Sequence, residues 1–600
     1  MIKLISAFLL LVIFAGCSPT DPEKKEAVEK SDIKANDSLA ALFSNYYDHR
    51  MQLFPLEATA NGDNRFNDLM PVDFTDSYRQ KLHQFFSSYN DSIATFNREN
   101  LNKNDQLSYD IFKYEMNMSL EGLTFHDNYT PANQFYGLPL TLGQMGSGEG
   151  NQPFKTIADY NNWLKRAAHF TEWTDSAIVY FKKGIDSGWV LPKALVVKMI
   201  PQLTAMETGD ASKSLFYGPI NKIPVTFSDS DKSHLKGEYV KLISQQLIPS
   251  YKKLADFLKN EYLPKARTTT GISGVKGGDK YYNYLVRFWT TTNKTPDEIY
   301  NTGLSEVKRI HGIMDSVKNA VGYKGDLNAF FNYMRTDKRF FPYKTPEDVL
   351  NAFRAIKEKV EPHLKDYFGI APKSKFEIRQ TEAFRAASSS IEYNPGTADG
   401  SRPGIFYIPI VDATKFNSTS GMESTFLHES IPGHHYQMSL QMENKNLPEF
   451  RKYSWYGAYG EGWALYCESM GKELGLYTDP YQYMGALSDD VHRAIRLVVD
   501  VAMHTKGMTR EEAIKYSLDN EPYTEDAVVA EIERYMAIPG QALSYKIGAL
   551  KIKELRDKYH QELGSKFNIS DFHDEYLKDG CMPLEIVEKK MDKWAEGVRE

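Results

Sequence analysis

Long stretches of helical periodicity follow one another along most of this 600-residue chain. Apolar side chains recur at three- and four-residue spacing, which is typical of helices that bury one face. No fixed-period repeat and no linker rich in Pro, Gly and Ser interrupts the series after residue 40. The pattern predicts helices at residues 38–60, 75–119, 154–207, 233–262, 295–321, 347–366, 421–445, 453–475, 480–506, 524–537 and 541–563. We therefore expect one mainly α domain over residues 38–600.

The region 375–413 differs from the helical pattern. Its segments FEIRQ, SSSIEY and GIFYIPIV alternate or run apolar with β-branched and aromatic residues, and NPGTADGSRPG separates the last two. We expect these to be short strands of a small β-sheet. This sheet precedes the segment that carries the chemical motif described below.

The N-terminus predicts export. Residues 1–17, MIKLISAFLLLVIFAGC, place a lysine before an apolar run that is too short to span a bilayer as a folded helix. Small residues stand directly before Cys17, as in lipoprotein signals, so we expect Cys17 to be lipidated. Residues 18–37 are charged and poor in large apolar side chains, which predicts a flexible tether. The protein would then be anchored to a bacterial membrane, on the outer membrane facing the periplasm or the cell surface.

Charge and cysteine content exclude other classes. The formal charge of -7 provides no basic footprint, so we do not expect nucleic acid as a partner. Beyond Cys17 only Cys467 and Cys581 remain, which excludes a disulfide framework but leaves one bridge open. Oligomeric state does not follow from the sequence.

The segment 420–438 concentrates metal-binding side chains. Ser420 and Glu423 have the spacing of a capping box, so a helix should begin there and carry His428 and Glu429 in its second or third turn. Three of the 14 histidines of the chain fall within eight residues here. An isolated helix histidine is usually structural, but this clustering beside a glutamate favours a metal site.

The histidine spacing departs from the usual zinc helix. Two histidines align on one helix face at i and i+4, but position 432 is proline. On a straight helix His434 would point about 240° away from His428, and His435 would align but lie about 10 Å further along the axis. Pro432 and Gly433 can distort the helix and bring His434 round.

A hydrolytic zinc site needs a third protein ligand, commonly a carboxylate, and one open position. Glu461 and Glu468 lie seven residues apart on one face of a predicted helix, about 10 Å apart along its axis, so only one should touch the metal. We expect Glu461 to be the ligand. Glu468 would then orient a histidine ligand.

The predicted helix 489–504 carries a narrow charged stripe: Arg493, Arg496, Asp500 and His504 fall within about 80° on a largely apolar helix. One interpretation is a face exposed to water. The other is a wet internal cleft, where an arginine grips a peptide carboxylate and Asp500 orients His504.

A Pro-Gly pair at 539–540 predicts a helix break, and such breaks suit ligand contact because they leave backbone groups unpaired. Arg534 and Tyr545 lie near it. Arg534 is a further candidate for substrate binding, and Tyr545 is our candidate donor to an oxyanion.

Several segments together resemble the bacterial family named domain of unknown function 885 (DUF885), which is assigned to zinc metallopeptidases with a thermolysin-like or neurolysin-like helical core. The resemblance covers most of the mature chain. Its marks are HESIPGHHYQ at 428–437, EGWALYCE at 461–468, RAIRLVVDVAMH at 493–504, ERYMAIPGQALSYKIG at 533–548 and, more weakly, residues 281–310.

The resemblance implies a site and an activity. The family pattern His-Glu-x-x-Pro-Gly-His falls on His428, Glu429 and His434, which selects His434 over His435 as ligand, and the family glutamate falls on Glu461. It implies peptidase chemistry with one zinc per chain, a substrate cleft between helical lobes, and a peptide as substrate.

The hypothesis that follows is a zinc hydrolase. Zinc would lower the pKa of a bound water toward about 7, and Glu429 would take its proton and return it to the leaving amine. Tyr545 or His504 would stabilise the oxyanion. The substrate would be fixed by an arginine, the candidates being Arg493, Arg496 and Arg534, and cleavage could be carboxypeptidase-like.

Two alternatives stay open from the sequence. One is a non-catalytic lipoprotein that binds peptides and has a structural metal site. The other is an amidase acting on cell-wall peptides, which shares the metal chemistry.

Overall fold

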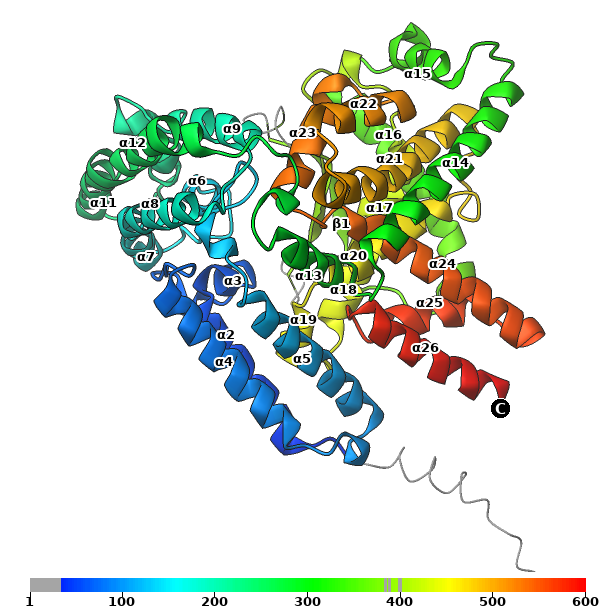
Figure 1. Cartoon of the computed structure of the whole chain (residues 1–600), viewed down its shortest axis with the longest axis horizontal. Coiled ribbons are helices and arrows are strands. Elements are labelled where there is room, and N and C mark those ends of the chain that lie inside the picture. Colours follow the sequence, from blue (N-terminus) through cyan, green and yellow to red (C-terminus); the bar gives the residue numbers. More distant parts are fainter. Residues whose placement is uncertain (1–33, 383–385, 387–389, 398–401) are drawn as a thin grey trace, which may run out of the picture.

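The computed structural model describes residues 34–382, 386, 390–397 and 402–600, and it is mainly helical (Figure 1). The mainly α class predicted from the sequence is therefore confirmed. The predicted signal, Cys17 and most of the tether lie outside the described residues. The first helix begins at Asp37, where the Asn36 side chain accepts a hydrogen bond from the Leu39 amide.

The first half of the chain forms a series of helices. They are α2 (Asp37–Leu53), α3 (Pro55–Ala60), α4 (Asp76–Ala94), α5 (Lys103–Gly122), α6 (Leu138–Gly146), α7 (Ile157–Ala168), α8 (Phe170–Ser187), α9 (Lys193–Thr204), α10 (Gly218–Asn221), α11 (Asp229–Leu242) and α12 (Ile248–Phe257). The predicted single helices 75–119 and 154–207 are wrong because each is interrupted. Asn102 caps a new helix within the first, and Pro192 precedes a new helix within the second.

The second half holds the remaining helices. They are α13 (Gly278–Thr290), α14 (Pro296–Ala320), α15 (Leu327–Thr336), α16 (Pro346–Tyr367), α17 (Met422–Glu429), α18 (His434–Glu443), α19 (Glu449–Lys452), α20 (Gly457–Ser469), α21 (Pro480–Thr505), α22 (Arg510–Asn520), α23 (Glu525–Ala537), α24 (Leu543–Leu563), α25 (Ile569–Leu577) and α26 (Leu584–Arg599). Several of these, such as α13 and α22, were not predicted.

The small sheet lies where the sequence predicts it, directly before α17. Its strands are β1 (Phe376–Gln380), β2 (Glu392–Asn394) and β3 (Gly404–Ile408), in the order β1-β3-β2. The central strand β3 pairs parallel with β1 and antiparallel with β2. Phe406 of β3 is fully buried and its ring packs edge-on against Phe353 of α16.

Two large hydrophobic cores hold the molecule together. One runs through α6 to α12 and on to α21, α22 and α23. The other joins α2, α4 and α5 to α17, α20 and α24 to α26, so the two ends of the described chain share a core (Figure 1). The helices that carry the predicted metal motif belong to this second core.

Neither a disulfide bridge nor a membrane-spanning helix is present among the described residues. Cys467 and Cys581 are both buried free thiols, so the one bridge that the sequence left open does not form. None of the helices in the described residues has the length and apolar character needed to span a bilayer.

Candidate metal centre

The motif segment folds as two helices with a sharp break between them. α17 ends at Glu429 and α18 begins at His434, so the predicted continuous helix over 421–445 is wrong. The predicted capping box is also wrong: Gly421 is the N-cap of α17, and Glu423 accepts the Tyr477 amide instead. The break is a stronger distortion than the bulge that the Pro-Gly pair predicts.

The break is held in place by its surroundings. The Trp463 indole nitrogen of α20 donates to the carbonyl of Pro432 over 2.8 Å. Gly433 has no room for a side chain, because a Cβ atom there would lie 2.0 Å from the carbonyl oxygen of His428 and 2.2 Å from that of Leu427. The backbone therefore turns back on α17, and this turn brings the ring of His434 beside that of His428.

Three predicted ligands come together at this break. Their ligand atoms, from His428, His434 and Glu461, all lie within 4.8 Å of one another. One Glu461 oxygen, Oε2, lies 3.5 Å from His428 Nε2 and 3.4 Å from His434 Nε2. The three side chains are 7%, 11% and 16% exposed, so the group is nearly closed off but not sealed. We call these three residues the metal cluster.

The spacing of the metal cluster fits a tetrahedral zinc ion. Zinc binds imidazole nitrogen and carboxylate oxygen at about 2.0 to 2.2 Å, so two ligand atoms at tetrahedral positions lie about 3.3 to 3.6 Å apart. The two Glu461 distances fall in this range. His434 Nδ1 has no hydrogen-bond partner among the described residues, and Nε2 is the nitrogen that faces Glu461. The residues present therefore fit the ion.

Charge in the metal cluster also suits a cation. Burial lowers the pKa of His428, but Glu461 and Glu468 outweigh it and raise that pKa to about 10. Burial raises the pKa of Glu461, yet the two histidines hold it well below its usual value. The carboxylates of Glu461 and Glu468 thus stabilise a positive charge at the metal cluster.

Glu468 orients the first ligand. Its Oε1 accepts from His428 Nδ1 over 2.7 Å, which leaves Nε2 facing the metal cluster. Arg493 Nη2 lies 3.5 Å from the same oxygen, and Arg493 Nη1 lies 3.4 Å from Asp489 Oδ1. Arg493 therefore supports Glu468, and its guanidinium already sits between two carboxylates rather than standing free for a substrate.

Glu429 and Tyr545 lie at the edge of the metal cluster. Burial raises the pKa of Glu429. The charges of His428 and His434 lower this pKa, and the charge of Glu461 raises it. The Tyr545 ring stacks on His428 with centroids 6.3 Å apart. Tyr545 is half-buried, so this side chain is not closed off from solvent.

A close helix contact places Tyr545 there. α20 carries Glu461 and α24 carries Tyr545, and the two helices touch at Gly462 and Gly548. A Cβ atom on Gly462 would lie 2.5 Å from the Cα atom of Gly548. Only glycine on both helices permits this approach.

His435 is placed elsewhere. Its Nδ1 lies 2.8 Å from the Tyr393 hydroxyl, and its ring packs on Phe376 of β1 at 4.6 Å between centroids. Burial lowers the pKa of His435 to about 4. His435 thus joins the helix to the sheet, and His434 is the histidine that faces His428.

At the C-terminal end of the charged stripe, the contacts of His504 and Asp500 contradict the roles predicted for them. His504 Nδ1 accepts from the Ile272 amide over 2.9 Å and Nε2 lies 3.0 Å from the Tyr535 carbonyl, so neither nitrogen is free for an oxyanion. Asp500 does not orient His504: it accepts from the Tyr282 hydroxyl and the Gly540 amide. Both residues are fully buried. They tie α21 to α13 and to the break before α24.

Arg496 and Arg534, the other two candidates for substrate binding, are also paired with side chains of the protein. Arg496 is 7% exposed and donates to Glu531 and to the Tyr535 hydroxyl, while its guanidinium lies 4.6 Å from the Tyr545 ring centroid. Arg534 is 25% exposed and lies 3.4 Å from Glu531. The stripe is therefore not a face exposed to water, and a substrate carboxylate would have to compete with Glu531 for these arginines.

Comparison with known proteins gives the family. The family model described as bacterial protein of unknown function (DUF885) matches residues 55–591. The chain belongs to the DUF885 family. No curated protein resembles this DUF885 chain closely enough to count as a match.

Two solved structures share the fold of this DUF885 protein. One is of a candidate lipoprotein from Colwellia psychrerythraea, with 27% sequence identity, a TM-score of 0.86, and coverage of 94% of this chain and 100% of that one. The other is of a candidate lipoprotein of unknown function from Shewanella oneidensis, with 18% identity, a TM-score of 0.70, and coverage of 93% and 100%. The second likeness shows the fold alone.

Sequence reasoning missed two neighbours of the metal cluster in this DUF885 protein. The Trp455 ring lies 5.7 Å from that of His434, and it is 42% exposed. Glu531 holds Arg496 and Arg534 beside Tyr545. A tryptophan directly before the Glu461 helix could have been noticed, but nothing in the sequence distinguishes Glu531 from a surface glutamate.

Proposed function

We propose that this protein is a zinc-dependent peptidase whose zinc ligands are His428, His434 and Glu461. One observation carries the proposal: a single Glu461 oxygen stands 3.5 and 3.4 Å from the Nε2 atoms of two histidines, the edge lengths of a tetrahedral zinc site. Zinc suits this donor set better than calcium or magnesium, which prefer oxygen ligands.

The residues around the metal cluster can divide the work of amide hydrolysis. When bound, zinc would polarise a substrate carbonyl and acidify a water molecule. Glu429 takes the proton of the attacking water and passes it to the leaving amine. The Tyr545 hydroxyl donates to the oxygen that becomes negative. Arg496 packs against the Tyr545 ring and holds it in position, and Glu468 does the same for His428 through a hydrogen bond.

The proposal includes export as a lipoprotein. The N-terminal sequence has the pattern of a lipoprotein signal ending at Cys17. The two structural relatives are themselves described as candidate lipoproteins. We place the protein on the outer membrane, facing the periplasm or the cell surface, with the catalytic domain tethered through residues 18–37.

Peptide substrates are proposed without a C-terminal preference. The carboxypeptidase-like reaction expected from the sequence needs an arginine free to bind a carboxylate. Arg493 and Arg496 are instead buried and paired with Glu468, Asp489 and Glu531. These two arginines are therefore not free to bind a C-terminal carboxylate.

Metal analysis and a mixed peptide library test the proposal together. The protein should bind about one zinc per chain and cut library peptides, detected by mass. Glu429→Gln should keep the zinc and lose about 10²- to 10⁴-fold in kcat, because it removes the proton carrier and no ligand. Glu449→Gln, an exposed change on α19, is the matched control and should behave as the parent.

Three outcomes would count against the proposal. Absence of zinc after mild purification removes its basis. Cleavage of cell-wall peptides but of no library peptide identifies an amidase instead. Zinc without any hydrolysis identifies a binding protein with a structural metal site.

A further inference from the structure

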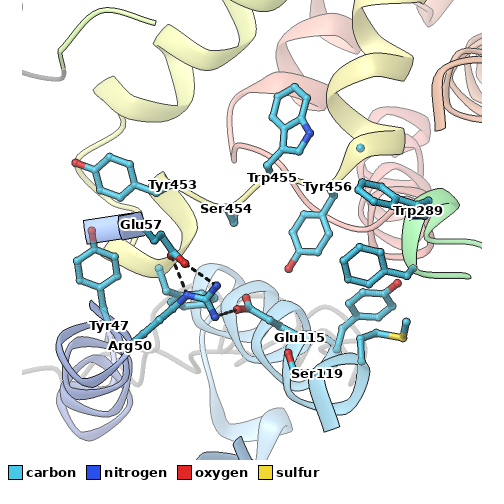
Figure 2. A pocket seen from close by; sticks show the side chains of 15 residues that line it. Tyr47, Arg50, Glu57, Glu115, Ser119, Trp289, Tyr453, Ser454, Trp455 and Tyr456 are labelled. Carbon is cyan, nitrogen blue, oxygen red and sulfur yellow. Dashed lines mark hydrogen bonds and ion pairs between the residues drawn. The ribbon is translucent and has the colours of Figure 1, made fainter. Parts of the chain in front are cut away.

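A cavity of about 390 Å³ has Trp455, a neighbour of the metal cluster, in its wall (Figure 2). Its walls come from parts of the chain that are far apart in sequence: α2, α3 and α5 on one side, and α13 with residues 453–457 on the other. Its volume is within the range of small-molecule sites and exceeds that of a single amino-acid side chain.

Trp455 connects the cavity to the metal cluster. It lines the cavity, and its ring lies 5.7 Å from the ring of His434. Gly457, also in the wall, is the first residue of α20, the helix that carries Glu461. A molecule whose scissile bond reached the metal cluster could therefore place a neighbouring group in this cavity.

Most of the wall is aromatic. Phe288 is 44% exposed and Trp455 is 42% exposed, which is unusual for side chains of this size. Exposed aromatic side chains gathered around a hollow mark a binding surface, and aromatic faces attract cations. The aromatic residues of the wall include Tyr47, Tyr114, Phe288, Trp289, Trp455 and Tyr456.

The charged groups of the wall leave a negative excess. They are Arg50, Glu57 and Glu115. Arg50 donates to both oxygens of Glu57, over 2.9 and 3.0 Å, which neutralises that carboxylate. Arg50 Nη1 lies 3.5 Å from Glu115 Oε1, which also accepts the Tyr46 hydroxyl over 2.8 Å. One arginine thus faces two carboxylates.

One buried polar atom of the wall has no partner to satisfy it, and one carboxylate oxygen is left for a ligand. The contacts of Glu115 with the Tyr46 hydroxyl and with Arg50 both go to Oε1, and this side chain is 20% exposed. The buried Tyr456 hydroxyl has no hydrogen-bond partner in the same part of the chain, and it points into the cavity (Figure 2). Buried polar groups are rarely left unpaired in a folded protein. A ligand that donates hydrogen bonds would satisfy the Tyr456 hydroxyl and find Glu115 Oε2 in the same wall.

We infer that this cavity is the substrate subsite for a positively charged group, either the free α-amine of a peptide or a lysine or arginine side chain. Glu115 pairs with the charge, the Tyr456 hydroxyl accepts a hydrogen bond, and the aromatic side chains of the wall surround the cation. The inference rests on the proposed peptidase function and specifies its substrate class.

Four peptides of one sequence test the inference. They carry a free or an acetylated N-terminus, each combined with either lysine or the neutral isostere norleucine. The parent should show kcat/KM at least about tenfold higher for the peptide that keeps the bound charge, the scale of a charge-assisted hydrogen bond. Acetylation removes the preference if the α-amine occupies the cavity, and norleucine removes it if the side chain does.

Variants locate the preference in the cavity. Glu115→Gln should reduce it to about threefold or less. Tyr456→Phe and Trp455→Leu keep the Glu115 contacts intact and should each weaken it, so the test survives if Glu115→Gln fails to fold. Glu121→Gln changes a carboxylate of the same helix outside the cavity and should leave the preference unchanged.

The failures of the two proposals are distinguishable. Equal cleavage of all four peptides, or a preference that persists in all three cavity variants, overturns the subsite while the peptidase stands. If the parent cuts neither these peptides nor any peptide of the mixed library, the peptidase proposal fails. Calorimetric binding of the four peptides to zinc-loaded Glu429→Gln then decides the subsite, which is overturned if charged and neutral peptides bind equally.

Discussion

The metal cluster and the charged stripe of α21 are built from the same kinds of residue and differ in what their polar atoms contact. In the metal cluster, His428 and His434 turn Nε2 atoms toward one Glu461 oxygen. In the stripe, both nitrogens of His504 are bonded to backbone groups. Both histidine sets are buried.

The difference shows which feature marks a site. A buried histidine whose nitrogens are both paired contributes hydrogen bonds that are costly to lose, and it has nothing left to offer a ligand. In the metal cluster, two histidines and a carboxylate turn ligand atoms toward one another, so that a cation between them can contact all three. Convergence of several ligand atoms on one position, and not burial or charge, therefore distinguishes the two regions.

Replacing one histidine in each region should give opposite results. His434→Ala should lose zinc and essentially all activity, because it removes a ligand, while the fold persists. His504→Ala should keep about one zinc per chain and lose about 2 to 4 kcal/mol of unfolding free energy, because it leaves the Ile272 amide and the Tyr535 carbonyl unpaired. Metal analysis and urea unfolding measure the two effects.

Two results would contradict this difference between the metal cluster and the stripe. Loss of zinc in His504→Ala, with a chain that still unfolds cooperatively, would make the stripe part of the metal site. Retention of zinc in His434→Ala would require another third ligand.

A change in Glu468 sharpens the comparison, because this residue links the two regions through His428 and Arg493. Glu468→Gln should weaken zinc affinity about 10- to 100-fold, the usual effect of removing a carboxylate that orients a ligand histidine. Competition with a chelator of known affinity measures it. Unchanged affinity would reduce Glu468 to a structural partner of Arg493.

The smallest expected effect is a pH dependence of stability from His504. Burial lowers the pKa of His504 to about 3, whereas an unfolded histidine titrates near 6.5. As pH falls below about 6.5 the unfolded chain takes up the proton first, so stability that is fully present above this pH is lost progressively toward pH 3.

His504→Gln should remove this contribution, because glutamine can make both hydrogen bonds without titrating. The free energy of unfolding, measured by urea between pH 6 and 4, should then fall less steeply than in the parent, by up to about 1.4 kcal/mol per pH unit. Other buried histidines, such as His435 and His573, titrate equally in both proteins. Parallel curves would show that His504 is protonated in the folded state.

The sequence alone determined the fold class and the position of the small sheet, and it offered the residues of the metal cluster, for which the family resemblance separated His434 from His435. Helical periodicity is local, so α14, α16 and α21 begin and end within two residues of the predicted bounds. The Pro-Gly pair at 432–433 also indicated that the helix must deform there. These inferences succeed because the information lies within one or two helical turns.

Only the tertiary structure decided how the distant polar groups are used. Whether Arg496 faces water, a substrate or Glu531 depends on where α23 packs on α21, and periodicity contains no information on this packing. The cavity is a stronger case, since Glu115 and Trp455 are separated by more than half of the chain and meet only because α5 shares a core with α20. A sequence shows which side chains one helix presents together, whereas unpaired atoms that converge from several helices arise from packing.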